Sequence, residues 1–358
     1  MKLGIITFHR ATNYGAVLQT YALTKYLNDI GFETEVIDYR DNRVDNEYKL
    51  FPKKSSVKRI IKDILYFPIK NKKNKKFEEF RQSKIKISKQ KYNNETLKNS
   101  EKKYDYFITG SDQVFNYKLT DFDKNYFLDF VKENNKKVSY AASLGMDSIP
   151  DDKKEEYKSL LSKFSKISIR EQQNKEMIED LINKKVEVNI DPSFLISKDE
   201  WQKIAKKPKE ENYILIFVMQ RNKSIFEFAE KFSKETNCRI IYIANDYKRI
   251  VKGKYKYNLS PEEWLGYFKY AKYVVTNSFH GLAFSILFEK NFYIELQKKP
   301  ATANARMNNL LKKFKLEDRK IENGKYEKKD IEDWSYAREE IEKEKTKTFE
   351  HFKFIKEE

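Results

Sequence analysis

The sequence predicts an α/β fold built from two successive sets of βα units. Short apolar runs rich in β-branched residues, which are typical of buried strands, alternate with segments whose apolar residues recur at helical spacing. The 358 residues are enough for two domains. Glycine and proline are scarce, with 9 and 7 residues, which argues against long disordered linkers.

The first set opens with a strand, a helix and a second strand. An alternating apolar strand at residues 3–8 leads through a loop at 9–15 into a helix at 16–30, and residues 33–38 return as a strand. The right-handed connection of such a unit places the 9–15 loop at the carboxyl edge of the sheet, where ligands bind in open α/β folds. Further strands of this set are expected at residues 104–109, 138–143, 166–169 and 186–190.

The second set follows a Lys-, Glu- and Pro-rich stretch at residues 198–211, which indicates a hinge or a surface segment. An almost continuous apolar run at 213–219 is typical of a strand in a buried parallel sheet. Ser260, Pro261 and Glu263 predict the start of a helix closed by a capping box. Further strands are expected at 239–244, 273–276 and 292–295, and a charged amphipathic helix at 331–354 is expected to pack back across the body.

The junction at residues 277–281, Asn-Ser-Phe-His-Gly, lies between the 273–276 strand and an apolar helix expected at 282–288. One of the three histidines of the chain, His280, lies there. The carboxyl end of a strand followed by the amino end of a helix offers free N–H groups and a dipole that favour an anion. A helix cap or a packed ring is the alternative interpretation of His280.

Several classes of protein are not expected. The loop after the first strand lacks Gly-x-Gly-x-x-Gly and Gly-Lys-Ser/Thr, so it predicts neither a dinucleotide site nor a P-loop. There is no apolar run of about 18 residues, and the first residues are typical of a strand, not of a signal peptide. Cys238 is the only cysteine, which excludes an internal disulfide and a Cys-based zinc site. We therefore expect a cytoplasmic protein.

The formal net charge is +18, for which a solvated basic surface is the simplest interpretation and attraction to an anionic membrane or a phosphorylated ligand is the alternative. No nucleic-acid partner is expected, because the chain has no aromatic-interleaved binding module. The basic stretch at 52–103 predicts a helix packed on the body, with an interfacial helix on an anionic bilayer as the alternative. Its apolar stripe is formed by Val57, Ile60, Ile61, Ile64 and Leu65.

Three polar residues lie where predicted elements begin or end. Asp112 follows the 104–109 strand and can cap a turn, or accept a proton or a sugar hydroxyl. Arg170 ends the 166–169 strand and can clamp a carboxylate or phosphate, with an ion pair to Glu171 or another acid as the alternative. Arg306, expected at the start of a helix, is a candidate anion contact or a surface residue.

Five motifs occur in an order that resembles the polysaccharide pyruvyl transferase family. They are Asn13-Tyr14-Gly15, Gly110-Ser111-Asp112, Ser168-Ile169-Arg170-Glu171, Asp191-Pro192-Ser193 and Ser278-Phe279-His280-Gly281. The resemblance implies two Rossmann-like lobes with mainly parallel sheets in a GT-B-like arrangement. We place the lobes at residues 1–165, with a basic helical insertion at about 52–103, and 166–325, followed by a helical tail at 326–358.

The resemblance also implies transfer of a pyruvyl group from phosphoenolpyruvate to two sugar hydroxyls, giving a ketal and phosphate during surface polysaccharide synthesis. Phosphoenolpyruvate is then a co-substrate, no metal or other cofactor is required, and the acceptor is a nucleotide- or lipid-linked sugar. In this interpretation His280 protonates the donor or steers the leaving phosphate, Arg170 clamps the anion, and Asp112 deprotonates or orients the acceptor hydroxyl. The other candidate substrate contacts are Asn13, Tyr14, Gly15, Ser111, Ser278 and Arg306.

The chain departs from the family pattern at one point. Where many members have Arg-Leu-His, it has Ser278-Phe279-His280, so one obvious anion partner is missing. The Ser278 hydroxyl, backbone N–H groups, Arg306 or Lys298 could replace it. Two other functions stay open: a GT-B-type glycosyltransferase that uses a nucleotide sugar, and a non-catalytic scaffold of a polysaccharide-assembly complex.

Overall fold

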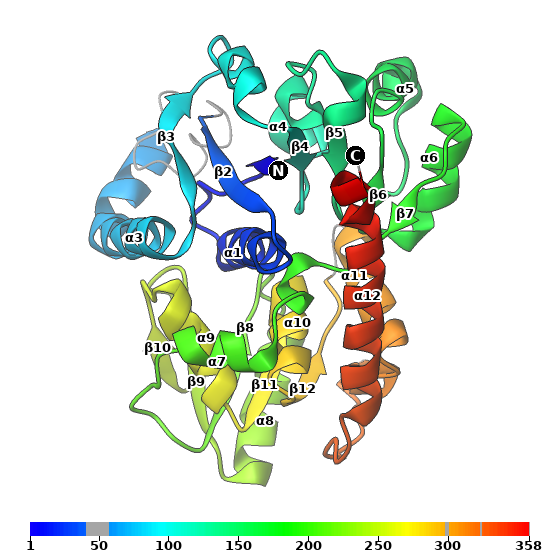
Figure 1. The fold of residues 1–358 in the computed structure, drawn as a ribbon. Helices are drawn as coiled ribbons and strands as arrows, with labels where there is room; N and C mark the ends of the chain where they lie inside the picture. Colours follow the sequence, from blue (N-terminus) through cyan, green and yellow to red (C-terminus); the bar gives the residue numbers. More distant parts are fainter. Residues whose placement is uncertain (41–56, 298–300, 323, 358) are drawn as a thin grey trace. The chain divides into compact units, whose positions relative to one another are not determined.

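The structure, a computed structural model, describes residues 1–40, 57–297, 301–322 and 324–357, and for residues 57–63 and 301–303 it describes the backbone alone. The chain divides into two compact units, coloured along the sequence in Figure 1. Unit 1 takes the described residues of Met1–Ser56, Arg81–Ile196 and Lys343–Glu358. Unit 2 takes those of Val57–Phe80 and Ser197–Glu342.

Unit 1 is built on a sheet of five parallel strands in the order β3-β2-β1-β4-β5 (Figure 1). Because β1 is central and flanked by β2 and β4, the direction of chain progression reverses between β1 and β4, which is the switch point of a doubly wound sheet. The strands are β1 (Lys2–Ile6), β2 (Glu33–Tyr39), β3 (Ile87–Tyr92), β4 (Tyr106–Thr109) and β5 (Lys137–Ser139).

A smaller parallel pair, β6 (Ser168–Ile169) and β7 (Glu187–Val188), continues unit 1 through a bridge between Ala142 and Ile169. The helices of this unit are α1 (Tyr14–Asp29), α4 (Tyr117–Thr120), α5 (Lys154–Leu161), α6 (Lys175–Ile182) and the part of α12 (Ser335–Glu357) that begins at Lys343. An aromatic-rich core that includes Phe107, Phe115, Phe127 and Tyr157 lies between the sheet and α5.

Unit 2 repeats the same topology. Its five parallel strands have the order β10-β9-β8-β11-β12, with the switch point between β8 and β11 (Figure 1). The strands are β8 (Tyr213–Phe217), β9 (Arg239–Ile243), β10 (Lys254–Lys256), β11 (Tyr273–Thr276) and β12 (Asn291–Ile294). The helices are α3 (Val57–Lys84), α7 (Lys198–Ile204), α8 (Lys223–Thr236), α9 (Pro261–Tyr270), α10 (Phe279–Leu287) and α11 (Ala301–Lys313).

The α/β fold class and the mainly parallel sheets are therefore confirmed. β8 and β11 are buried along their whole length, as the continuous apolar runs predicted. The capping box at the start of α9 is also present, with the Glu263 N–H bonded to Ser260 Oγ at 3.1 Å and the Ser260 N–H bonded to Glu263 Oε2 at 2.7 Å.

The division of the chain differs from the predicted boundary at residue 165. Residues 166–196 belong to unit 1 because β6 continues its parallel pairing and because the Tyr140 hydroxyl donates to the Ile190 carbonyl at 3.1 Å. The C-terminal helix is shared: its residues from Lys343 on belong to unit 1, and those before it belong to unit 2. It is therefore not a separate tail at 326–358.

The basic segment is also organised differently from the expectation. Its helix α3 belongs to unit 2 as far as Phe80, held there by an ion pair between Lys76 and Glu263 at 2.5 Å and by stacking of Tyr66 on Tyr247. It is thus not an insertion in the first lobe, and the basic segment also contains the strand β3, which the sequence did not predict.

The predicted apolar stripe of this segment is only partly described. The side chains of Val57, Ile60 and Ile61 lie outside the described residues, as does the whole of residues 52–56. Ile64 and Leu65 are 60% and 62% exposed, whereas Phe77 and Phe80 further along α3 are buried. Among the described side chains of α3, the buried ones therefore lie further along the helix than Ile64 and Leu65.

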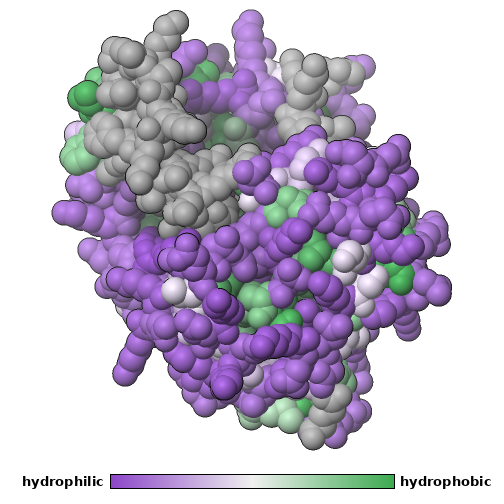
Figure 2. Space-filling view, turned by 90° about the horizontal axis from the view of Figure 1, so that it is seen from above, coloured by the Kyte–Doolittle hydropathy of each residue, from purple (hydrophilic) through white to green (hydrophobic). Residues whose placement is uncertain are grey.

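Hydrophilic residues predominate on the face of the molecule drawn in Figure 2, with small hydrophobic areas between them. This agrees with a sequence in which 36% of the residues are charged. In the described part of the chain, none of the helices combines the length and the apolar composition needed to cross a membrane.

Candidate active site

The candidate residues gather at the carboxyl edges of the two sheets. In doubly wound sheets ligands bind beyond the carboxyl ends of the strands at the switch point. In unit 2 that place is taken by the loops after β8 and β11, which include His280, and in unit 1 by the loops after β1 and β4, which include Ser111 and Asp112. Each unit therefore has its own group of candidate residues.

In unit 2 the helix after β11 begins earlier than predicted. α10 starts at Phe279, not at Leu282, because Ser278 caps it: the Ser278 Oγ accepts a hydrogen bond from the Gly281 N–H at 3.4 Å. His280 is consequently a residue of the first helical turn and is partly exposed. Gly281 is required here, since a Cβ at this position would lie 2.2 Å from Thr276 Oγ1.

A buried asparagine that the sequence reasoning left without a role ties two loops of this edge together. Asn277 accepts hydrogen bonds from the backbone N–H of Met219 at 2.7 Å and of Gln220 at 3.3 Å, and its amide donates to the Gln220 carbonyl at 2.6 Å. These contacts fix the loop after β8 against the turn that carries His280. Its position directly after a buried strand was the signal that could have identified it.

The loop after β12 joins the same group. Gln297 donates from its side chain to the Asn277 carbonyl at 2.8 Å, and its backbone N–H and carbonyl pair with the side chain of Asn304 on α11 at 2.8 and 2.7 Å. α11 begins at Ala301, so Arg306 lies within the helix and not at its start as expected. The Arg306 guanidinium lies 5.8 Å from the centre of the Phe279 ring, beside the first turn of α10.

Glu295, just after β12, adds a carboxylate to this edge and was also missed. One of its oxygens accepts from Ser224 Oγ at 2.5 Å and from the Asn222 amide at 3.3 Å, while the other makes no hydrogen bond to any described residue. The unit 2 edge thus combines an imidazole, a guanidinium, a carboxylate and the N–H groups of a helix start. Lys298, named as a substitute for the missing family arginine, lies outside the described residues.

In unit 1 the turn after β4 is closely packed. Gly110 has φ +110°, and a Cβ there would lie 2.3 Å from the Tyr140 carbonyl oxygen, so only glycine fits. The Thr7 hydroxyl at the end of β1 donates to the Ser111 carbonyl at 3.0 Å and thereby joins the two strands of the switch point. Asp112 accepts a hydrogen bond from the Gln113 N–H at 2.8 Å, a local turn contact that corresponds to the alternative interpretation of this residue.

Arg170 is buried in unit 1 and is not directed toward solvent. It forms an ion pair with Asp191 at 2.8 Å, in which the two side chains are 3% and 0% exposed, and it also donates to Ser111 Oγ. Asp191 further caps the turn that begins at Pro192 by accepting from the Ser193 N–H at 2.9 Å. This geometry corresponds to the ion-pair alternative for Arg170, with Asp191 as the acid and not Glu171.

The first loop supplies a helix cap. The Asn13 side chain accepts a hydrogen bond from the Ala16 N–H at 3.3 Å and so begins α1, which starts at Tyr14. Tyr14 and Gly15 are buried in the first turn of the helix. Of these three candidates, Asn13 is the one with an exposed part at the carboxyl edge.

His9, which directly follows β1, is a further residue that the sequence reasoning left without a role. Its ring is 1% exposed and lies 3.2 Å from Asp38 Oδ1 and 3.2 Å from the Thr7 carbonyl oxygen. Arg40 contacts the other oxygen of Asp38 at 2.7 Å. Burial alone would raise the pKa of Asp38, but His9 and Arg40 hold it below its ordinary value. The network braces the ends of β1 and β2.

Among the described residues, no group of three or more His, Cys, Asp and Glu side chains is arranged to hold a metal ion. The fold and these two edges define a two-unit α/β protein whose polar loops lie where doubly wound sheets bind ligands.

The sequence comparison identifies the family. The sequence model of the polysaccharide pyruvyl transferase family matches residues 13–294, and the chain belongs to this family, a family of transferases. The match covers all five motifs from Asn13 to Gly281. No curated protein sequence matches the chain significantly.

Solved structures that are similar to this chain share little sequence with it. A putative UDP-N-acetylglucosamine 2-epimerase from Listeria monocytogenes has a TM-score of 0.49 at 11% identity, over 86% of this chain and 81% of that one. A glycosyltransferase from Rickettsia africae ESF-5 has a TM-score of 0.48 at 12% identity, over 100% and 99% of the two chains. The E. coli heptosyltransferase WaaC with ADP has a TM-score of 0.41 at 13% identity, over 85% and 89%.

Proposed function

We propose that this protein transfers the pyruvyl group of phosphoenolpyruvate to two hydroxyls of a sugar, forming a cyclic ketal and releasing phosphate during surface polysaccharide synthesis. The observation that carries the proposal is the family membership over residues 13–294. The acceptor class that fits this role is a nucleotide- or lipid-linked sugar. Phosphoenolpyruvate is the only co-substrate that the proposed reaction needs.

The reaction moves the protons of two sugar hydroxyls and breaks one phosphate ester bond. Protonation of C3 of the enol converts the methylene to a methyl group and leaves C2 electron-poor. The first sugar oxygen then bonds to C2, the bond from C2 to the phosphate oxygen breaks, and the second sugar oxygen completes the ketal. Of the two hydroxyl protons, one is balanced by the new C–H bond and the other leaves on the phosphate.

His280 is the group that we assign to the proton transfer. Its partly exposed ring stands in the first turn of α10, where the helix dipole and the backbone N–H groups favour an anionic donor. An imidazole can donate a proton near neutral pH, and general acid catalysis of this kind contributes about 10²–10⁴-fold.

Arg306 and Ser278 are the residues that we assign to the donor's charges. Arg306 of α11 lies beside Phe279, which is in the same first turn of α10 as His280, and a guanidinium can hold a carboxylate or phosphate through two parallel hydrogen bonds. Arg170 is committed to Asp191 and therefore serves in this proposal to position Ser111 and the turn after β4, not to clamp the donor. Asp112 remains the candidate to orient the acceptor hydroxyl, through the carboxylate oxygen that does not contact Gln113.

The test is incubation with phosphoenolpyruvate and a panel of nucleotide-linked and lipid-linked sugars. We expect phosphate release that depends on the acceptor, together with an acceptor product heavier by one ketal-linked pyruvyl group. Nucleotide sugars offered without phosphoenolpyruvate form the second arm, because sugar transfer in that arm would replace the proposal with the glycosyltransferase alternative. Absence of turnover in both arms, with His280→Ala leaving the biological output unchanged, would favour the scaffold.

We also propose that α3 brings the protein to an anionic membrane, where a lipid-linked acceptor would lie. The exposed residues Ile64, Leu65 and Pro68 are followed along the helix by the exposed Lys72 and Lys75, at spacings that place them on one face. An apolar patch beside lysines is complementary to an acidic bilayer surface. Co-sedimentation with phosphatidylglycerol vesicles should be lost in Ile64→Glu/Leu65→Glu and should be absent with phosphatidylcholine vesicles; equal binding by this variant would refute the proposal.

A further inference from the structure

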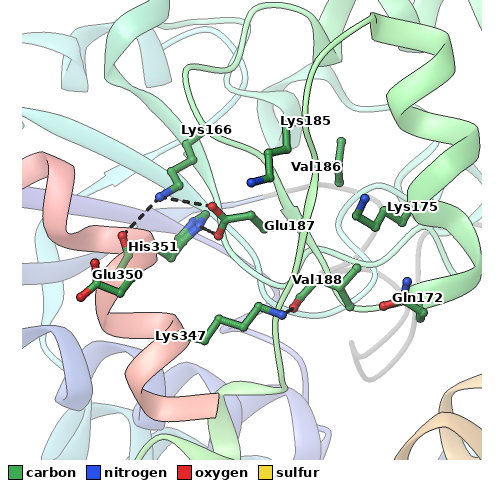
Figure 3. A pocket seen from close by; sticks show the side chains of 10 residues that line it. All are labelled: Lys166, Gln172, Lys175, Lys185, Val186, Glu187, Val188, Lys347, Glu350 and His351. Atoms are coloured by element: carbon green, nitrogen blue, oxygen red, sulfur yellow. Dashed lines mark hydrogen bonds and ion pairs between the residues drawn. The ribbon is translucent and has the colours of Figure 1, made fainter. Parts of the chain in front are cut away.

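Unit 1 contains a basic hollow that none of the candidate site residues discussed above lines. Its volume is about 360 Å³, and it is lined by residues of β7 and α12, by the first residue of α6 and by residues just before β6, α6 and β7 (Figure 3). Four lysines line it, against two glutamates, so the lining carries a net positive charge. The lysines are Lys166, Lys175, Lys185 and Lys347.

One of the two glutamates, Glu187, already contacts basic side chains of the same wall. Glu187 lies 2.7 Å from His351 Nδ1 and 3.3 Å from Lys166 Nζ. Although burial by itself would raise the pKa of Glu187, the contacts with His351 and Lys166 lower it to about 2, so the carboxylate is ionised at neutral pH. Glu187 is therefore already paired with Lys166 and His351, and it forms no ion pair with the other three lysines of the lining.

The His351 ring belongs to the same wall. It is 1% exposed, with Nε2 3.0 Å from the Ser139 carbonyl oxygen and Nδ1 facing Glu187. Burial lowers the pKa of His351 below its ordinary value, although the contact with Glu187 opposes this shift. The ring therefore contributes hydrogen bonds to the wall rather than a positive charge.

Two ammonium groups of the lining form no ion pair with a described acid. Lys185 makes no hydrogen bond or ion pair with any described residue, although its charge helps to lower the pKa of Glu179, and Lys347 donates to the carbonyl of Val188. Lys175, by contrast, is paired with Glu179 at 2.7 Å. The remaining acid of the lining, Glu350, has an exposed side chain on α12.

We propose that this hollow binds a small phosphate-bearing anion between Lys185 and Lys347, and that the anion thereby fastens α12 to β7. The exposed ammonium groups of Lys185 and Lys347, neither of which forms an ion pair with a described acid, and the exposed amide of Gln172 supply the donors. Figure 3 shows Lys347 reaching from α12 toward Val188, while Lys185 comes from the segment that precedes β7. The volume suits a phosphate, a diphosphate or a sugar phosphate, since it is at the small end of ligand pockets.

The proposed anion would act on a helix that both units share. α12 contributes its residues up to Glu342 to unit 2 and the rest to unit 1. A ligand that holds Lys347 against β7 stabilises the unit 1 half of this helix, and because the effect requires only binding at the hollow, it is independent of the proposed transferase reaction.

The experiment is calorimetric titration of the full chain with inorganic phosphate and with diphosphate at constant ionic strength. We expect saturable binding that weakens by about tenfold or more in Lys185→Gln and in Lys347→Gln, since each variant removes one charge-assisted contact. Lys132→Gln is the matched control, because it removes an exposed lysine of unit 1 that lies outside the hollow, and it should bind as the wild type does. Diphosphate that binds where phosphate does not would identify the larger ligand.

Hydrogen exchange provides the second readout. Binding should slow amide exchange in residues 343–357 of the wild type and leave it unchanged in the Lys185→Gln/Lys347→Gln variant. The proposal is overturned if neither probe binds, if the Lys132→Gln variant loses as much affinity as the other two, or if binding survives in the double variant and disappears in Arg306→Gln. The last result would place the anion at the carboxyl edge of unit 2.

Discussion

The two units have the same strand order, yet the polar residues at their carboxyl edges are used differently. In unit 1, Arg170 and Asp191 neutralise each other, and His9 is enclosed by Asp38 and the Thr7 carbonyl. In unit 2, His280 and Arg306 stand partly exposed beside the start of a helix. The shared topology determines where polar groups collect, while the packing around them decides whether they support the structure or remain accessible to a ligand.

The largest effect is expected at His280, the partly exposed imidazole of unit 2. His280→Asn should lower turnover with phosphoenolpyruvate by about 10²–10⁴-fold, because the side chain loses its transferable proton. The melting temperature should stay close to that of the wild type, since the residue is partly exposed. Steady-state kinetics and thermal unfolding of the same preparation check both statements, and full activity in the variant would remove His280 from the chemistry.

The opposite pattern is expected at Arg170, the enclosed cation of unit 1. Arg170→Met leaves the buried Asp191 carboxylate without its partner and should lower the free energy of unfolding by about 3–5 kcal/mol. Urea denaturation measures the loss, and the double variant Arg170→Met/Asp191→Leu should recover part of it. A stable Arg170→Met protein with a raised KM for phosphoenolpyruvate would instead show that Arg170 contacts the donor.

A smaller effect is expected at Arg306. Arg306→Gln should raise the KM for phosphoenolpyruvate by about tenfold, equivalent to about 1.4 kcal/mol, because one charged contact to the donor is lost. Lys312→Gln on the same helix is the control, since Lys312 is exposed and outside the group around Phe279. If both variants raise KM equally, the effect comes from the general charge of α11 and not from Arg306.

The smallest effect is expected in the free energy of unfolding at acidic pH. The pKa of Glu187 is lowered from 4.5 to about 2, so the folded state favours the ionised carboxylate. Its contribution to stability is complete above about pH 4.5 and is lost as the pH falls toward about 2. Denaturation at a series of pH values should show this decline, and Glu187→Gln should make it shallower. An identical pH dependence in the variant would mean that other carboxylates account for acid unfolding.

The sequence was sufficient to predict most of the βα units and the edge of each sheet on which the polar loops lie. Apolar runs identified β8 and β11, and a helix-start signal identified α9, because these depend on residues close together in the chain. Two short or charged strands, β3 and β10, were missed, since their residues Ile-Ser-Lys-Gln-Lys-Tyr and Lys-Tyr-Lys have almost no apolar pattern.

Contacts between residues that lie far apart in the chain could not be predicted from the sequence. The residue type of Arg170 allowed either an anion clamp or an ion pair, and only the fold brings Asp191, which lies on a different segment, to within 2.8 Å. In the same way, α3 belongs to unit 2 because Lys76 meets Glu263, a pairing across a large part of the chain. For Asn277 the only local signal was its position directly after a buried strand, and its partners Met219 and Gln220 lie on a distant segment of the chain.

The division of unit 1 into separate segments has a consequence for how the protein is made. Its last segment supplies Thr348, which meets the Tyr140 hydroxyl at 2.9 Å, and the buried Phe352 and Ile355. During synthesis from the amino end, the apolar surface that this last segment covers in unit 1 therefore stays exposed while residues 197–342 of unit 2 are translated. Unit 1 is thus the first unit whose synthesis begins and the last whose folding can be completed. In the interval its exposed apolar surface makes it the part of the protein most in need of a chaperone.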